Sequence, residues 1–131
     1  MEKDKKQQEL MFKLSMFEQQ IQNINQQIQA VENAIVDMTS LEFGLDNIKG
    51  KKGEEILASI GKGIFVKAKL LSEDLIVDIG DKNLIKKSIP DTQKIIANQI
   101  EKLKEARQEL DKAMEEINTQ LTQTMTESQG E

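Results

Sequence analysis

A chain of 131 residues has the length of one ordinary domain, but only 37% of its residues are hydrophobic and 3% aromatic, too few for a thick globular core. Its net charge of -5 argues against nucleic acid as a partner, because no broad basic field is available to collect phosphates. Cysteine and histidine are both absent, which excludes disulfides, thiolate metal sites and histidine acid–base chemistry, so we expect neither a cofactor nor a metal.

The N-terminal segment is not typical of a signal peptide. Lys13 interrupts its short apolar cluster, Glu18 and a glutamine-rich run follow, and no small-residue cleavage site is present. Farther along the chain, no apolar run approaches the roughly 20 residues that span a bilayer. We therefore expect a soluble, cytoplasmic protein that does not bind membranes.

A long helix over residues 1–48 is predicted first, because its apolar residues recur at alternating steps of four and three. These residues are Leu10, Leu14, Phe17, Ile21, Ile24, Ile28, Val31, Ile35 and Met38, with Leu45 one heptad later. A spacing that averages 3.5 residues keeps one narrow stripe facing a partner helix. The positions between are mostly Gln, Asn and Glu, so the segment is predicted to be half of a coiled coil.

Two β-hairpins are predicted over residues 49–87, where glycines end the helical pattern. Ile64, Val66, Ala68 and Leu70 alternate with Lys67 and Lys69, as in a half-buried strand, after a Gly61-Lys62-Gly63 turn. Leu75, Val77 and Ile79 begin a second hairpin with the turn Gly80-Asp81-Lys82-Asn83. The first turn is not a phosphate-binding loop, because it lacks the Lys-Ser/Thr ending and no helix follows it.

A second long helix is predicted over residues 88–126. Ser88 can cap it, with Pro90 in the first turn and Asp91 three residues after the serine. Its apolar stripe is Ile96, Ile100, Leu103, Leu110, Met114, Ile117 and Leu121. Arg107, the only arginine, occupies one stripe position, either as a device that sets the helix register or as a side chain reaching outward to a carboxylate. The tail 127–131 is predicted to be disordered.

The two helices are predicted to pair antiparallel, because the hairpins between them turn the chain back. Residues 10–48 and 88–126 have equal length, about 58 Å at 1.5 Å per residue. The numbers of paired residues then sum to about 136, which places Leu121 near Ser15 and Met125 near Met11. The fold class is therefore α+β: a long antiparallel two-helix coiled coil whose halves are joined by two β-hairpins.

The stretch from Leu10 to Phe17 carries more apolar side chains than its seam needs. Met11, Phe12 and Met16 fall outside the heptad seam and face water, although burying such a side chain is worth roughly 1.5 to 3 kcal/mol. We considered three explanations: a neighbouring subunit or tighter local bundle, a surface for transient apolar partners, and disorder. Either of the first two requires a partner for this end of the chain.

The order of these elements resembles that of the alpha-type subunit of archaeal prefoldin. The resemblance is most specific in "SIGKGIFVKAKL" and "LIVDIGDKNLIKKSI", and the matching positions are Gly61, Gly63, Phe65, Lys67, Ala68, Leu70, Gly80, Lys87 and Ser88. The sequence departs from the family pattern at Ser59, where proline is usual, and at Asp81-Lys82-Asn83, where a second glycine-containing turn is usual.

The resemblance implies a chaperone subunit that makes no covalent change to its client. Two alpha-type and four beta-type subunits are expected to assemble, their hairpins pairing into a β-barrel-like platform. Unpaired hairpin edges are consistent with this expectation. The expected assembly residues are Ile56, Ile60, Ile64, Phe65, Val66, Val77 and Ile79; the alternative is that they form a private core within one chain.

The tips of the coiled coil are expected to bind non-native proteins without ATP and to deliver them to a group II chaperonin. Flexible methionine- and phenylalanine-bearing surfaces can repack around many apolar segments. The expected client-binding residues are Leu10, Met11, Phe12, Leu14, Met16, Phe17, Leu121 and Met125.

Three other function classes are alternatives to the chaperone. A coiled-coil scaffold or filament assembled through the hairpins is the main alternative. A membrane-surface helix at residues 10–17 is disfavoured, because glutamines and Glu18 occupy the face that would have to be basic. An enzyme has the least support, since no nucleophile, base and orienting group can be assembled from motifs.

Overall fold

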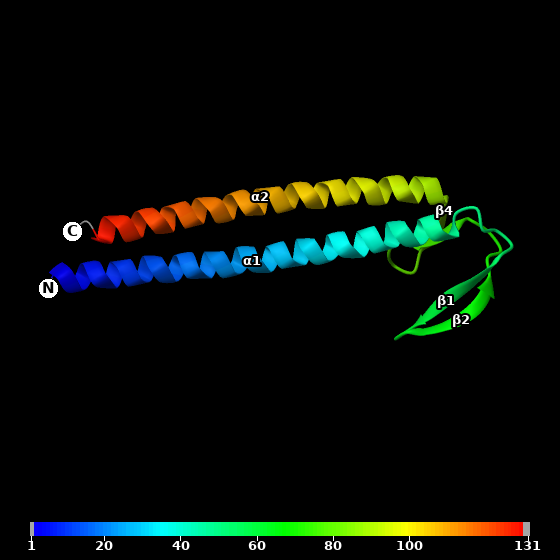
Figure 1. Cartoon of the computed structure of the whole chain (residues 1–131), viewed down its shortest axis with the longest axis horizontal. Coiled ribbons are helices and arrows are strands. Elements are labelled where there is room, and N and C mark those ends of the chain that lie inside the picture. Colours follow the sequence, from blue (N-terminus) through cyan, green and yellow to red (C-terminus); the bar gives the residue numbers. More distant parts are fainter. Residues whose placement is uncertain (1, 130–131) are drawn as a thin grey trace. The chain divides into compact units, whose positions relative to one another are not determined.

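A computed structural model describes residues 2–129 and contains two long helices and four short strands (Figure 1). In chain order the elements are α1 (Glu2–Ile48), β1 (Glu55–Gly61), β2 (Ile64–Lys69), β3 (Leu75–Asp78), β4 (Leu84–Lys87) and α2 (Ile89–Gln129). The predicted α+β fold class, with two helices flanking two antiparallel hairpins, is confirmed.

The C-terminal helix is longer than predicted. α2 continues to Gln129, so the expectation of disorder is wrong for residues 127–129. Charge and heptad periodicity decline from Asn118 onward, but no glycine or proline occurs between Pro90 and residue 130 to break the helix. Residues 130 and 131 of the expected tail lie outside the described part of the chain, as does residue 1 of the first predicted helix.

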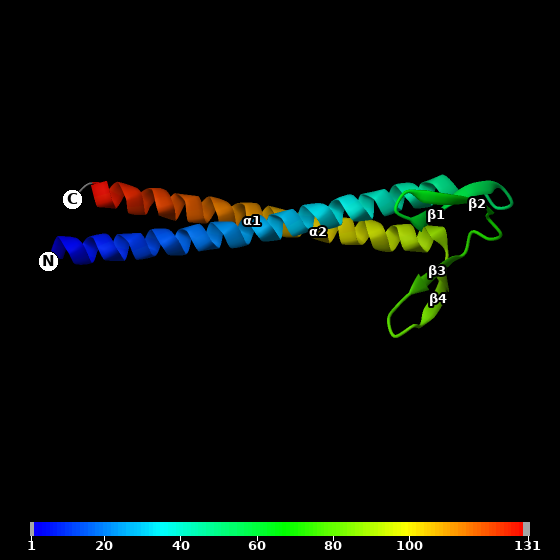
Figure 2. The ribbon, with the colours of Figure 1, turned by 90° about the horizontal axis from the view of Figure 1, so that it is seen from below.

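The chain divides into two compact units, each of which takes part of both helices. The helical unit comprises residues 2–35 and 102–129, and the hairpin unit comprises Val36–Glu101. Within the helical unit, α1 and α2 run antiparallel, and the start of α1 and the end of α2 lie at the same end of the pair, as Figures 1 and 2 both show. The antiparallel pairing and the meeting of the termini agree with the sequence prediction.

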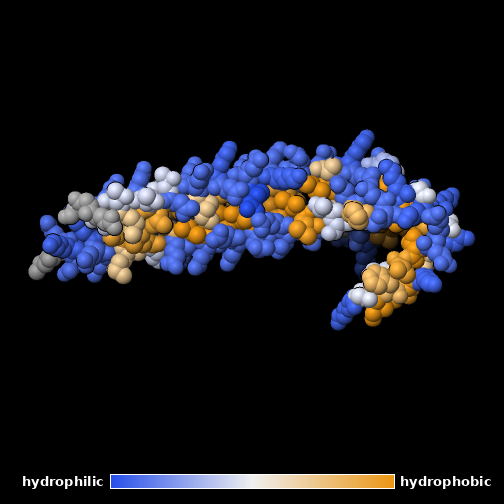
Figure 3. Space-filling view, in the orientation of Figure 1, coloured by the Kyte–Doolittle hydropathy of each residue, from blue (hydrophilic) through white to orange (hydrophobic). Residues whose placement is uncertain are grey.

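The predicted seam residues of the helical unit face one another between the helices. The seam positions from Leu10 to Ile35 and from Leu103 to Leu121 are half-buried, whereas most side chains between them are exposed. Figure 3 shows the resulting apolar stripe along the visible face of this helix pair. None of the described side chains of this unit is fully buried, as expected when only two helices pack together.

The hairpin unit contains the small buried core. Leu45, Ile89 and Ile96 are the buried apolar side chains of the described residues. Met38, Ile48, Leu75 and Ile100 pack against them. The core therefore joins the end of α1, the start of α2 and the first residue of β3.

Ser88 caps the N-terminus of α2 as predicted. Its Oγ accepts a hydrogen bond from the backbone N–H of Asp91 at 3.2 Å. Its carbonyl oxygen accepts both the N–H of Thr92 at 3.1 Å and the Thr92 hydroxyl at 2.9 Å. These bonds satisfy donors that the first turn of a helix otherwise leaves unpaired, so they define where the helix begins.

The first hairpin turns at Lys62 and Gly63, within the predicted glycine turn. Both residues have positive φ, 51° and 77°, the combination that a two-residue hairpin turn matching strand twist requires. β1 and β2 pair antiparallel from Glu55 opposite Lys69 to Ser59 opposite Phe65. The register then shifts before Gly61 pairs with Ile64, which leaves Ile60 as an extra residue in β1.

The second hairpin is shorter and forms a separate two-stranded sheet. β3 and β4 pair from Leu75 opposite Lys87 to Asp78 opposite Leu84. Asp78 Oδ1 accepts the backbone N–H of Gly80 at 2.9 Å, and the N–H of Asn83 reaches the Gly80 carbonyl at the same distance. The predicted turn over residues 80–83 is confirmed, with Asp81 and Lys82 at positive φ.

Candidate interaction surfaces

Four exposed apolar side chains in the helical unit form what we call the tip surface: Met11, Phe12, Met16 and Met125. Met11 and Phe12 are 70% and 67% exposed, and Met16 and Met125 are 46% and 44% exposed. The heptad pattern placed the first three outside the seam, and the structure agrees. Each keeps at least 44% of its surface exposed, so they are available to a partner.

The other predicted tip residues contribute to the seam rather than to the surface. Leu10, Leu14, Phe17 and Leu121 are half-buried. The seam step that follows Leu121 is taken by Thr124, which is half-buried, whereas Met125 lies one position further round the helix. This geometry separates the eight predicted residues into an inner row that holds the helices together and an outer set that faces solvent.

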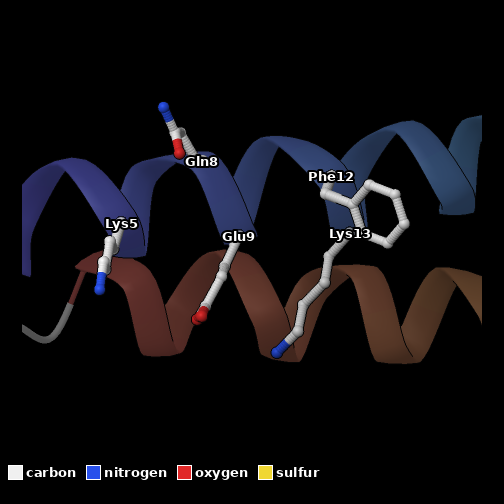
Figure 4. Close-up of a pocket in the computed structure, with 5 residues that line it drawn as sticks. All are labelled: Lys5, Gln8, Glu9, Phe12 and Lys13. Carbon is white, nitrogen blue, oxygen red and sulfur yellow. The ribbon is translucent and has the colours of Figure 1, made fainter.

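Open cavities lie beside the tip surface. One of about 330 Å³ is lined by Phe12, Lys5, Gln8, Glu9 and Lys13, all on α1. In Figure 4 Lys5, Glu9 and Lys13 form a row along one side of the helix, and the Phe12 ring lies next to Lys13. The depression is thus walled by the aliphatic stems of charged side chains as well as by the aromatic ring.

A second cavity, of about 350 Å³, is lined by both helices of the helical unit. Met16 and Phe17 contribute its apolar wall, and the remaining lining residues are polar: Lys13, Gln20, Gln120, Gln123, Thr124 and Glu127. It brings together segments about one hundred residues apart in the sequence. The antiparallel pairing of the helices places Phe17 in the wall of this cavity and brings the C-terminal residues close to Met16.

The helix register differs slightly from the predicted one. Arg107 pairs with Glu32 in the helical unit, and Gln93 donates to Asp46 at 2.7 Å in the hairpin unit. In both pairs the residue numbers add to 139 rather than to about 136. The difference of three residues is less than one helical turn, so each residue's neighbour on the partner helix lies slightly farther along that helix than predicted. The lining of the second cavity agrees with this register, because it joins Phe17 to residues 120–124.

Arg107 reaches outward to carboxylates, one of the two alternatives posed by the sequence. Its Nη1 donates to Glu32 Oε1 across the helix pair, and its Nε donates to Asp111 Oδ1 at 3.1 Å on α2. The hydrogen bond to Glu32, followed by that to Asp111, raises the pKa of Arg107 above its ordinary value. A cation therefore interrupts the apolar seam and is paired on both sides.

The predicted assembly residues on the hairpins are mostly exposed. Ile60, Ile64 and Ile79 are 59–66% exposed, Phe65 and Val66 are also exposed, whereas Ile56 and Val77 are half-buried. Figure 3 shows apolar side chains gathered over the visible face of the β1–β2 hairpin. The described chain does not bury these side chains in a private core, which was the alternative considered for them.

Sequence reasoning missed three exposed apolar residues on the hairpins: Leu57, Ile76 and Leu84. They are 63–69% exposed. The cross-strand partner of Ile76 is Lys86, and that of Leu84 is Asp78, so both lie on the face opposite Leu75 and Val77. The signal was present in the continuous apolar run Leu75–Val77, which is typical of a strand covered on both faces.

Each hairpin strand has one edge that pairs with no other described strand. In the described part of the chain each strand pairs with a single neighbour, so its outer edge carries backbone N–H and C=O groups with no sheet partner. Two-stranded sheets are marginal by themselves. The hairpins therefore combine exposed apolar faces with edges suited to further strand pairing.

No helix among residues 2–129 is long and apolar enough to cross a membrane. Over the same residues, the acidic side chains form no cluster of three or more that could hold a metal ion.

Comparison with known proteins identifies the architecture. Residues 17–131 match the family model for the prefoldin subunit, which covers most of the chain. The chain belongs to the prefoldin family. Prefoldins are chaperones rather than enzymes, so membership supports the role of a chaperone subunit that assembles with other prefoldin subunits.

Curated relatives are prefoldin alpha subunits from archaea. The chain is 32% identical over 96 residues to prefoldin subunit alpha of Methanosphaera stadtmanae, covering 73% of this chain and 70% of the relative. It is 29% identical over 119 residues to prefoldin subunit alpha of Methanobrevibacter smithii, covering 90% and 82%. Prefoldin subunit alpha 1 of Methanocaldococcus jannaschii is 26% identical over 118 residues, with the same coverage.

A solved structure has the same fold. It is a cryo-EM structure of filamentous PFD from Methanocaldococcus jannaschii, with a TM-score of 0.74 and 20% sequence identity. The match covers 88% of this chain and 97% of that chain. The resemblance to the alpha-type subunit of archaeal prefoldin that the sequence motifs indicated is confirmed by these comparisons.

Proposed function

We propose that this chain is a subunit of an ATP-independent holdase that captures non-native proteins in the cytoplasm. The tip surface binds apolar segments of the client, with Leu10, Leu14, Phe17 and Leu121 behind it. The complex then delivers the client to a group II chaperonin. Beta-type prefoldin subunits complete the assembly, in the proportion of two alpha to four beta.

The observation that carries this proposal is the exposure of the tip surface. Met11 and Phe12 are about as exposed as charged side chains usually are, yet they are among the most apolar residues in the unit. Phe12 and Met16 are four residues apart and therefore lie on one side of α1, so they gather exposed apolar area beyond the single residues that are normal on a protein surface. A patch of this kind needs an occupant.

The residue types fit a client that has no fixed sequence. Three of the four side chains are methionines, which are unbranched and polarisable and can fill irregular gaps. Each tip offers only a small apolar area, so a single tip binds weakly. Several tips in one complex raise the local concentration of binding sites, which gives avidity while each contact still dissociates readily.

Assembly through the hairpins is the second part of the proposal. The predicted residues Ile56, Ile60, Ile64, Phe65, Val66, Val77 and Ile79 contribute to it. The exposed residues Leu57, Ile76 and Leu84 extend the set. Neighbouring subunits pair with the free strand edges and cover these apolar faces, because an uncovered two-stranded sheet has little to stabilise it.

The test is suppression of aggregation by the co-assembled complex. A denatured model protein is diluted into buffer and its light scattering is followed with and without the chain assembled with a beta-type subunit. Phe12→Ser combined with Met16→Ser should weaken suppression several-fold at equal concentration, because it removes two of the four exposed tip side chains. Size-exclusion chromatography must show an unchanged complex.

A matched control keeps this test specific to apolar surface. Gln22→Ser combined with Gln26→Ser changes two exposed polar side chains of the same helix, also four residues apart and outside the cavities beside the tip surface, and should leave suppression at the unsubstituted level. An intact complex that suppresses no aggregation contradicts the holdase. Equal losses in the two double variants contradict the assignment of binding to the tip surface.

A scaffold or filament built through the hairpins remains the second candidate. The observation that favours it is the fold match to a protein whose solved structure is filamentous. Sedimentation of the chain without any beta-type subunit distinguishes the two. Long homopolymers with no protection of denatured protein support the scaffold, whereas a small complex that protects denatured protein supports the holdase.

A further inference from the structure

One apolar face of α1 in the hairpin unit has no role in the seam, the core or the tip surface. Val36 and Phe43 are 62% and 70% exposed. They are seven residues apart, so they lie on the same side of the helix, two turns from each other. Leu45, in the core, projects from the opposite side. We call Val36 and Phe43 the outer-face pair.

The surroundings of the outer-face pair are acidic. Asp37 lies on one flank of this face and Asp46 on the other, with the uncharged Thr39 and Ser40 between Val36 and Phe43. From residue 14 to residue 48 the chain contains five carboxylates and no basic residue. An apolar pair with a carboxylate rim favours a partner that is apolar at its centre and basic around it.

The β1–β2 hairpin has such a surface. Leu57 lies opposite Lys67 in the strand register, and Phe65 is the diagonal neighbour of Leu57 on the same face. Leu57 and Phe65 are 68% and 56% exposed. Lys67 and Lys69 continue the same face and are exposed, and Glu55, opposite Lys69, is the one carboxylate on it. The segment 49–87 as a whole carries nine lysines and six carboxylates, so its charge is opposite to that of the helix.

We propose that the outer-face pair of one copy of this chain receives the Leu57–Phe65 face of the β1–β2 hairpin of a second copy, with Lys67 and Lys69 set against the acidic rim. Each copy carries both halves of the contact, so two copies can exchange them around a two-fold axis. Val36, Phe43, Leu57 and Phe65 are all exposed within their own chain, and the contact covers them together. This inference rests on the proposed function only in placing more than one alpha-type copy in the complex.

Absence of cysteine makes this contact directly testable by disulfide formation. One preparation carries Phe43→Cys with an affinity tag and the other carries Leu57→Cys without it. The two are mixed and oxidised, both as the chain alone and co-assembled with a beta-type subunit. The expected product is a disulfide dimer of one tagged and one untagged copy.

A matched control replaces Phe43→Cys by Gln99→Cys, an exposed position on α2 in the same unit. It should form at least tenfold less of the mixed dimer, because disulfides need the two cysteines within a few ångströms. Absence of the 43–57 disulfide in both preparations overturns the proposal. Equal yield from the control overturns it as well, since the reaction then reports random collision.

Charge reversal provides an independent measurement. Asp37→Lys and Lys67→Glu should each weaken self-association by about tenfold, measured by sedimentation equilibrium at low salt. Mixing an Asp37→Lys chain with a Lys67→Glu chain should restore most of it, because both exchanged contacts of the mixed dimer then bring opposite charges together. Lys94→Glu, on α2, serves as a charge-matched control without effect. Circular dichroism must show unchanged helix content in every variant.

The outcome is separable from that of the proposed function. Loss of the 43–57 contact together with undiminished suppression of aggregation overturns this inference alone. A robust 43–57 contact in a complex that suppresses no aggregation supports this inference and overturns the holdase alone.

Discussion

The helical unit and the hairpin unit treat their apolar residues in opposite ways. The helical unit buries none of its described side chains fully, yet it leaves only the four residues of the tip surface as exposed large apolar groups. The hairpin unit contains all three buried residues and thirteen exposed large apolar ones. One unit completes its apolar contacts within the chain, and the other does not.

The difference comes from the geometry of the elements. Each helix has one narrow apolar stripe, and a second helix is sufficient to cover it. A two-stranded sheet has two faces and two edges, and a small core can cover only part of that surface. We therefore propose that the exposed apolar residues of the hairpin unit contact other subunits, and that those of the tip surface make occasional contacts with clients.

The largest expected effect is on the small core. Ile96→Ala should lower the free energy of unfolding by about 2–4 kcal/mol, because Ile96 is 3% exposed and the cavity left behind cannot fully collapse. Urea unfolding followed by circular dichroism measures the loss. Ile95→Ala, at the neighbouring exposed position, is the control and should cost well under half as much. Equal losses would mean that the hairpin unit has no distinct core.

A smaller effect is expected at the start of α2. Ser88→Ala removes the side-chain acceptor of the Asp91 N–H and should cost about 1 kcal/mol in the same unfolding experiment. Ser88→Asp, which retains an acceptor oxygen, should recover most of the loss. If Ser88→Asp is as unstable as Ser88→Ala, the hydrogen bond is not what stabilises this helix end.

The smallest expected effect tests whether ionic pairing helps to hold the helical unit together. Arg107→Glu places a third carboxylate beside Glu32 and Asp111 and should lower the midpoint of thermal unfolding by a few degrees. Adding Glu32→Arg should restore part of that loss. Strictly additive effects of the two substitutions would show that the pair contributes no coupling energy.

Much of the fold can be predicted from the sequence because the relevant interactions are local or strictly periodic. The 4-3 spacing from Leu10 identified the seam residues that the structure half-buries, and Ser88 with Asp91 located the cap. Gly63 and Gly80 marked the turns, since positive φ is easily adopted by glycine. For the same reason the exposed positions of Met11, Phe12 and Met16 followed from their places in the heptad.

Tertiary structure decided what depends on contacts between distant segments. It fixed the helix register, in which Glu32 lies within reach of Arg107, and gave that arginine the outward, ion-paired role. It placed Ile60 outside the strand register and left Leu57, Ile76 and Leu84 uncovered. Periodicity shows which side of an element is apolar. Whether that side is buried depends on which other segments of the chain pack against it, and the two-stranded hairpins have too few such segments.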